Sequence, residues 1–201
     1  MKAIRLISII FVGGLLTYLT FKSRYQTFFL EAVVWVFSMC VGIILFLWST
    51  VQDYKNYKSS KEVLSFLPTA IAVILTVLIL SVQYDINADF EKPSLLTVYY
   101  DGDFNGTGID FKNDGTYIFQ SSAVGMSNFQ YGNYQIYGDK IVIDKNELEN
   151  VVMTNMLEVR PGQIEYADST RSEKFLYQLS NSGHIIDDAI EFRVVIDNRN
   201  K

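Results

Sequence analysis

Three long apolar runs dominate the first 83 residues of the chain. They cover residues 4–21, 28–48 and 63–82, and few charged residues interrupt them. At a rise of about 1.5 Å per residue, each run reaches roughly 27 to 31 Å as a helix, which matches the hydrocarbon core of a bilayer. A helix also pairs its own backbone N–H and C=O groups, as a membrane-spanning segment must. The pattern therefore predicts a membrane region over residues 1–83 with three transmembrane helices.

The hydrophobic pattern changes after residue 83. Residues 84–94 are polar and contain Pro93, so we expect a connector there. From residue 95 to residue 201, apolar positions alternate with polar ones, which is typical of strands. Dipeptides that favour tight turns separate these strands: Asn105-Gly106, Asp114-Gly115, Gly138-Asp139, Pro161-Gly162 and Ser182-Gly183.

Residues 95–201 have room for about eight short strands and show no alternation of strands with helices. An antiparallel sheet follows, and closure into a barrel is favoured because closure removes sheet edges that could pair with neighbouring chains. The predicted fold is therefore an α+β membrane protein, with three N-terminal transmembrane helices followed by a small antiparallel β-barrel of about eight strands.

The formal charge divides at the same place. Residues 1–83 hold seven Lys and Arg against three acidic residues, whereas residues 84–201 hold ten against nineteen. Basic residues near the spans suit the headgroups of a bilayer, and an acidic water-facing domain argues against binding a nucleic acid polymer.

The positive-inside rule gives an orientation. Five Lys and Arg fall in the N-terminus and the 51–62 loop, against three on the other side of the predicted spans. This places the N-terminus in the cytoplasm and the barrel outside, and we expect a bacterial inner membrane. The first run also resembles a signal peptide, but no small-residue cleavage pattern follows it, so we expect it to be retained. If the first run were cleaved off or lay only at the membrane interface, the helical hairpin of the second and third runs would need its own orientation. The barrel could then lie in the cytoplasm.

Two features inside the spans have more than one interpretation. Small residues spaced by four, Gly13 with Thr17 and Ser38 with Gly42, would let helices approach closely and support a homo-oligomer, although such pairs also arise by chance. Glu31 is a carboxylate near the start of an apolar run, which is a functional candidate in a membrane, but it lies within reach of headgroups or of Arg24.

Aromatic residues on the inward face of the strands are the candidate ligand-binding residues. We expect them to fill the core of the barrel. If the barrel is hollow, they would line a cup for a small ligand: Tyr117, Phe119, Tyr134 and Tyr177.

One acidic segment partly matches a calcium loop. Asp101, Asp103 and Asn105 form the opening D-x-D-x-N-G, in which alternate oxygens would surround the cation. The twelfth position should be a bidentate Glu but is Lys112. A polar hairpin explains the same residues, so we predict no metal site.

The chain offers little for catalysis. It contains one histidine, His184, and one cysteine, Cys40, which lies within the second apolar run. These residues provide no thiolate metal cluster and no His-based zinc site, and no carboxylate pair stands out as acid and base. We therefore predict a protein that is not an enzyme and that uses no cofactor.

The barrel sequence resembles a known family. The stretches GIDFKNDGTYIF (residues 108–119) and YGNYQIYGDKIVID (residues 131–144) are similar to the repeated hairpins of small lipocalin-like (calycin) domains. The plan of helices followed by one small barrel also resembles the transmembrane β-barrel effectors of bacterial cyclic-nucleotide antiphage systems. That resemblance implies a barrel that senses a nucleotide and helices that damage the inner membrane. Those effectors typically have two spans and a cytoplasmic barrel.

Three functional hypotheses follow. The leading one is a non-enzymatic integral membrane protein whose barrel binds a small ligand or a protein partner at the membrane surface. The alternative is an antiphage-type effector in which a nucleotide-sensing barrel controls membrane disruption by the helices. A third class is a barrel enzyme that uses acidic groups such as Asp101 and Asp103.

Overall fold

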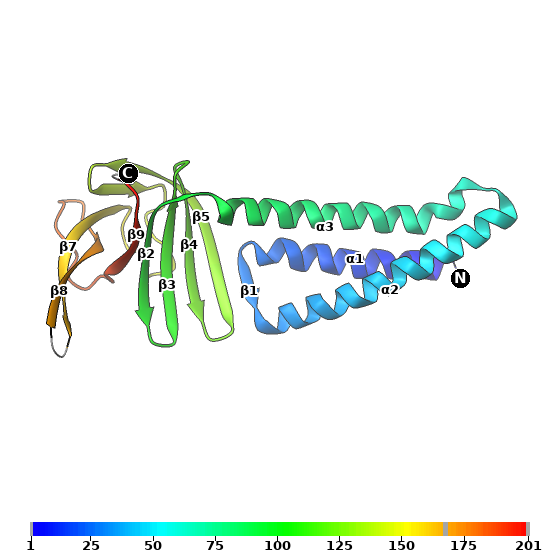
Figure 1. The fold of residues 1–201 in the computed structure, drawn as a ribbon, viewed down its shortest axis with the longest axis horizontal. Coiled ribbons are helices and arrows are strands. Elements are labelled where there is room, and N and C mark those ends of the chain that lie inside the picture. Colours follow the sequence, from blue (N-terminus) through cyan, green and yellow to red (C-terminus); the bar gives the residue numbers. More distant parts are fainter. Residues whose placement is uncertain (1, 167–168, 200–201) are drawn as a thin grey trace. The chain divides into compact units, whose positions relative to one another are not determined.

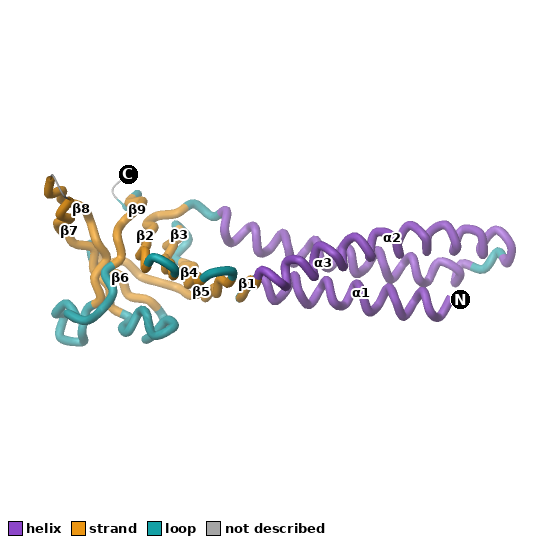
Figure 2. The backbone as a smooth tube through the Cα atoms, turned by 90° about the horizontal axis from the view of Figure 1, so that it is seen from below, coloured by secondary structure: helices purple, strands orange, loops and turns teal. Residues whose placement is uncertain are grey.

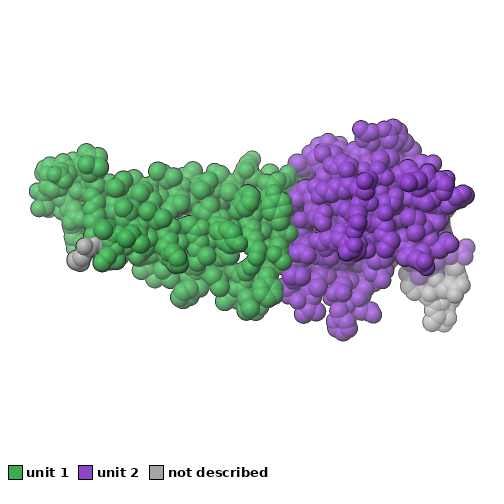
Figure 3. Space-filling view, turned by 180° about the vertical axis from the view of Figure 1, so that it is seen from behind, with its two compact units in different colours: residues 1–89 green, residues 90–201 purple. Residues whose placement is uncertain are grey.

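The computed structural model describes residues 2–166 and 169–199, and the chain divides into two compact units. The first unit comprises residues 1–89 and the second comprises residues 90–201 (Figure 3). The first unit is mainly helical and the second is built of strands (Figure 2).

Three helices make up most of the first unit: α1 (Lys2–Ser23), α2 (Phe29–Ser60) and α3 (Leu67–Glu91) (Figure 1). A short strand, β1 (Gln26–Phe28), joins α1 to α2, and a 3₁₀ turn, η1 (Val63–Phe66), precedes α3. All three helices are long and apolar enough to cross a membrane, as the hydropathy pattern predicts. Their large apolar side chains are mostly exposed, which suits a lipid surrounding.

The helices are longer than the apolar runs. The segment predicted as a connector, residues 84–94, is helical up to Glu91, because no residue before Pro93 breaks the helix. Lys92 precedes this proline and is restricted to extended conformations, so the helix ends there. The predicted 51–62 loop is likewise helical to Ser60, and Lys61 ends α2 in the left-handed conformation with φ 58°.

Eight antiparallel strands close the second unit into a barrel. They are β2 (Ser94–Gly102), β3 (Asn105–Lys112), β4 (Thr116–Ala123), β5 (Met126–Tyr137), β6 (Lys140–Ile143), β7 (Met156–Tyr166), β8 (Ser169–Gln178) and β9 (Phe192–Asp197). Strands β2 to β8 each pair with the next strand in the chain, and β9 lies between β8 and β2. Pairing of β5 with β6 closes the cylinder, so the predicted barrel is confirmed.

Three of the five predicted turns are confirmed. Asp114-Gly115 joins β3 to β4 and Gly138-Asp139 joins β5 to β6, with positive φ at both glycines. Ser182-Gly183 also lies in a turn, with φ 81° at the glycine.

The other two turn predictions were wrong. The β2–β3 turn is centred on Asp103 and Phe104, and Asn105-Gly106 already belongs to β3. Pro161-Gly162 lies inside β7, opposite Lys174 and Glu173 of β8. Proline is tolerated there because residue 161 pairs on one side only among the described strands, as at the edge of a sheet.

Side chains fill the inside of the barrel. Fifteen buried hydrophobic residues form one cluster contributed by all eight strands and by the 148–152 turn. Phe111 lies at its centre, with ring centroids 6.2 Å from Tyr117 and 5.0 Å from Tyr134. The expectation of a filled core therefore describes this interior better than a ligand cup does.

Candidate functional site

Three of the four candidate cup residues lie in the packed core. Tyr117 and Phe119 are fully buried on β4, and Tyr134 is buried on β5. Each phenol has a partner: Tyr117 donates to Asp144 Oδ1 at 3.2 Å and Tyr134 donates to the carbonyl of Lys112 at 2.6 Å. Burial raises the pKa of both phenols, and neighbouring carboxylates raise it further. These hydroxyls therefore satisfy the core and do not face an open cavity.

Tyr177 is not brought together with the other three. On β8 the residue that enters the core is Leu176, so Phe175 and Tyr177 point to the opposite face. The two outer rings lie 6.2 Å apart, above Gly162 of the neighbouring strand. A Cβ at Gly162 would lie 2.6 Å from Phe175, so the glycine makes room for this ring.

An open depression of about 520 Å³ lies on the outside of the barrel, beside this aromatic pair. It is formed by the end of β2, by β8, by the 187–191 segment and by the start of β9. Its lining includes three aromatic residues, Tyr99, Tyr100 and Phe175, and four acidic residues, Asp101, Asp187, Asp188 and Glu191. We refer to these seven residues as the acidic-aromatic depression.

Glycines set the orientation of the two tyrosines. Gly106 lies under the Tyr99 ring, and a Cβ there would lie 2.0 Å from the phenol oxygen. A Cβ at Gly102 would lie 3.2 Å from the ring of Tyr100. This explains why the Asn-Gly pair is in a strand. Its glycine accommodates the aromatic ring of Tyr99 on the neighbouring strand β2 and is not needed for a turn.

The depression carries an excess of negative charge. All four of its carboxylate residues are exposed. The one basic residue in its lining, Arg193, already pairs with Glu173 at 2.5 Å. Burial and the nearby charge of Glu191 raise the pKa of Tyr177, so this phenol stays neutral. Carboxylates beside aromatic faces favour a cation, because both attract positive charge.

The calcium candidates do not come together as a cage. Asp101 is the second-last residue of β2, Asp103 adopts φ 64° in the turn, and Asn105 starts β3. The backbone N–H of Phe104 donates to the carbonyl of Gly102 at 2.8 Å, so Asp103 is the central residue of a γ-turn. Among the described residues, no group of three His, Cys, Asp or Glu side chains converges on a point.

Lys112, at the twelfth position of that motif, has a structural role. It is 2% exposed, and its ammonium lies 2.7 Å from Asp110. It also donates to the carbonyls of Phe90 and Lys92, at 2.8 and 3.0 Å. The lysine therefore binds carbonyls at the C-terminal end of α3, where cations are favoured.

In the first unit, a polar cluster ties the three helices together at one end. Arg5 of α1 pairs with Asp53 of α2 at 2.8 Å, and both side chains are almost wholly buried. Asp53 also accepts hydrogen bonds from the backbone and hydroxyl of Thr69 on α3, at 3.1 and 2.8 Å. Arg5 donates to the carbonyl of Ser49 at 3.1 Å, and its guanidinium lies 5.9 Å from the ring centre of Trp48.

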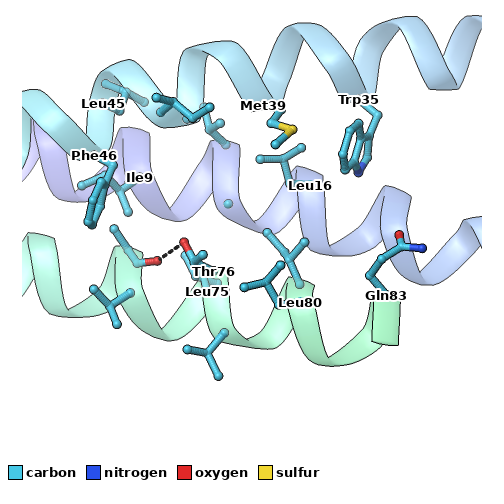
Figure 4. A pocket seen from close by; sticks show the side chains of 18 residues that line it. Ile9, Leu16, Trp35, Met39, Leu45, Phe46, Leu75, Thr76, Leu80 and Gln83 are labelled. Atoms are coloured by element: carbon cyan, nitrogen blue, oxygen red, sulfur yellow. Dashed lines mark hydrogen bonds between the residues drawn. The ribbon is translucent and has the colours of Figure 1, made fainter. Parts of the chain in front are cut away.

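Beyond this cluster the helices enclose an apolar groove of about 490 Å³ (Figure 4). Its lining runs from Ile9 and Phe46, one turn away from the polar cluster, to Trp35 and Gln83 at the other end. Thr76 is one of its few polar residues, and its hydroxyl is bound to the carbonyl of Ala72 at 2.9 Å. The groove therefore presents hydrocarbon along almost its whole length.

The residues singled out within the spans have partners in the chain. Glu31 pairs with Lys22, while Arg24 pairs with Asp89 at 2.7 Å. Gly42 faces Val12 and Leu16 of α1, and Gly13 faces Leu75 of α3. The two glycines thus serve packing within the chain, and the homo-oligomer stays a prediction.

Sequence reasoning missed both the acidic-aromatic depression and the Arg5–Asp53 pair. The depression joins β2, β8, β9 and a loop that lie up to ninety residues apart in the sequence, so only the closed barrel assembles it. A signal for the ion pair was present: Asp53 follows Ser49 by one helical turn just beyond the second apolar run.

No family model, curated protein or solved structure matches the chain.

Proposed function

We propose that the chain is a non-enzymatic membrane protein whose barrel binds a positively charged segment of a partner protein at the membrane surface. The three helices cross the bilayer, with the N-terminus in the cytoplasm and the barrel outside, in a bacterial inner membrane. Support for the anchor comes from three helices that are long and apolar enough to span.

The observation that carries the binding proposal is the acidic-aromatic depression. The interior of the barrel is filled, so a ligand has to bind on the outside. Four exposed carboxylates around Tyr99, Tyr100 and Phe175 suit lysine or arginine side chains, whose cations pair with carboxylates and rest on aromatic faces. A cyclic nucleotide, as the antiphage alternative requires, carries phosphates that these carboxylates would repel.

The test measures binding of charged probes to the full chain in a neutral detergent at low salt. We expect an acetylated tetralysine peptide to bind, and cyclic di-AMP not to bind. The Asp187→Asn, Asp188→Asn double variant removes two carboxylates from the depression and should weaken peptide binding by about tenfold or more.

The matched control removes two charges elsewhere on the barrel. Glu147→Gln with Glu149→Gln changes two residues of the turn after β6, which is outside the depression, and should leave peptide affinity within about twofold. The proposal is wrong if both double variants weaken binding equally. Tight binding of cyclic di-AMP would instead support the effector hypothesis.

A further inference from the structure

The end of the first unit that holds Lys2 extends beyond the length of a span. At about 1.5 Å per residue, the 32 residues of α2 measure about 48 Å, whereas a hydrocarbon core is about 30 Å thick. The excess falls at the C-terminal end of α2, because its charged residues after Glu31 begin at Asp53. Figure 1 shows the end of α2 and the start of α3 lying beyond the N-terminal end of α1.

Four lysines gather on this end. Lys55 and Lys58 lie in the last turns of α2 and Lys61 caps its C-terminal end, at intervals of three residues, and all three are exposed. Lys2 is held nearby, since its ammonium donates to the carbonyl of Leu64 at 2.6 Å. We call these residues the lysine end.

The positive charge of the lysine end is only partly compensated. Asp53 is already neutralised by Arg5, which leaves Glu62 as the nearest acidic residue in the chain sequence. Lys61 lies 5.9 Å from the centre of the Tyr57 ring, and no carboxylate is paired with Lys55 or Lys58 among the described residues.

Exposed apolar side chains accompany the lysines. Val63 and Leu64 of η1 are 77% and 70% exposed, although they lie in the turn between two helices. A site that combines lysines with exposed aliphatic side chains matches the boundary between headgroups and acyl chains, where cations meet phosphates and apolar groups insert.

We propose that the lysine end is a binding site for the headgroups of anionic phospholipids in the leaflet it faces. This inference rests on the proposed insertion of the three helices, which brings the lysines to headgroup level, and on the complementary charge of lysine and lipid phosphate. It does not depend on the barrel or its ligand.

The test counts lipids bound to the purified full chain. The protein in neutral detergent is titrated with equal amounts of the zwitterionic lipid POPC and the anionic lipid POPG, and bound lipids are resolved by native mass spectrometry. We expect preferential binding of POPG. The triple variant Lys55→Gln, Lys58→Gln, Lys61→Gln should lower this preference by about fivefold for each lysine removed.

Two controls separate charge from fold. Replacing the same three lysines by Arg keeps the charge and should keep the preference for POPG. Replacing three barrel lysines, Lys140, Lys145 and Lys174, by Gln removes the same charge elsewhere and should also leave it unchanged. The inference is overturned if the α2 variant with Gln retains the preference, or if the barrel variant loses as much.

The experiments distinguish failure of the proposed membrane insertion from failure of the proposed headgroup site. A protein that binds POPC and POPG equally would overturn the lysine end as a site and leave the anchor intact. A protein that binds neither lipid in detergent would likewise overturn only the lysine end, whereas release of the chain from membranes by alkaline carbonate without detergent would overturn both.

Discussion

Asp53 links all three helices of the first unit through a single carboxylate. It pairs with Arg5 of α1, sits on α2, and accepts two hydrogen bonds from Thr69 of α3. Removing one partner of a buried pair is costly, because it leaves the other charge without compensation.

We expect Asp53→Asn to destabilise the helical unit by about 3–5 kcal/mol, because Arg5 would stay buried without its counter-charge. Unfolding of the full chain by increasing SDS in mixed micelles measures this, and fluorescence of Trp48, which lies beside Arg5, reports it. The control is Glu31→Gln, whose pair with Lys22 is about a third exposed on each side and should cost less than about 1 kcal/mol. Equal losses in the two variants would contradict this role for Asp53.

At the residue scale, the sequence predicted the inward-facing aromatic side chains correctly on two strands and wrongly on a third. Tyr117, Phe119 and Tyr134 were correctly expected to face into the barrel. Tyr177 was also expected to face into the barrel, and that prediction was wrong. Leu176 enters the core, and the aromatic residues on either side of it cover the outside of β8. Alternation fixes two faces of a strand, but hydrophobicity does not say which face is inside when both carry apolar residues.

The adjacent glycines of α1 have different surroundings. A Cβ at Gly13 would lie 2.6 Å from Leu75 of α3, whereas nothing lies within 4 Å of a Cβ at Gly14. The two positions therefore form a matched pair for testing how α1 packs against α3.

We expect Gly13→Leu to destabilise the bundle by about 1–3 kcal/mol, because the added side chain overpacks the contact with Leu75. Gly14→Leu should be neutral or stabilising by up to about 1 kcal/mol, because it improves helix propensity and enters open space. The same unfolding measurement in mixed micelles compares both variants with the wild type. If Gly14→Leu costs as much as Gly13→Leu, the packing of α1 on α3 is not as described.

At the scale of elements, the three long helices and the eight barrel strands follow from the hydrophobic period, but β1, η1 and several boundaries do not. Residues 84–91 are polar and yet continue α3, since polarity does not end a helix that lacks Gly or Pro. Pro161-Gly162 suggests a turn by composition, but the long β7–β8 hairpin places it inside a strand. Local signals alone cannot reveal pairing partners that are distant in sequence.

At the scale of the whole molecule, the division into an apolar helical unit and an acidic barrel was evident from the sequence, and the structure confirms both parts. The closing order of the barrel, with β9 between β2 and β8, was not evident. That order creates the acidic-aromatic depression, which explains why the candidate site was found only in the folded chain.

The proposed function requires the turn after α2 and the barrel to lie on opposite sides of the membrane. With three spans and the orientation that we propose from the positive-inside rule, the turn after α2 would lie in the cytoplasm and the barrel outside. Two exposed positions report on this: Ser59 in the last turn of α2, and Asn146 in the barrel after β6.

The most direct measurement is cysteine labelling in intact cells with a membrane-impermeant maleimide, after Cys40 has been replaced by Ala. We predict that a cysteine at position 146 is labelled in intact cells, and that a cysteine at position 59 is labelled only after permeabilisation. Labelling of position 59 with protection of position 146 would contradict the external barrel. Equal labelling of both positions in intact cells would contradict three spans.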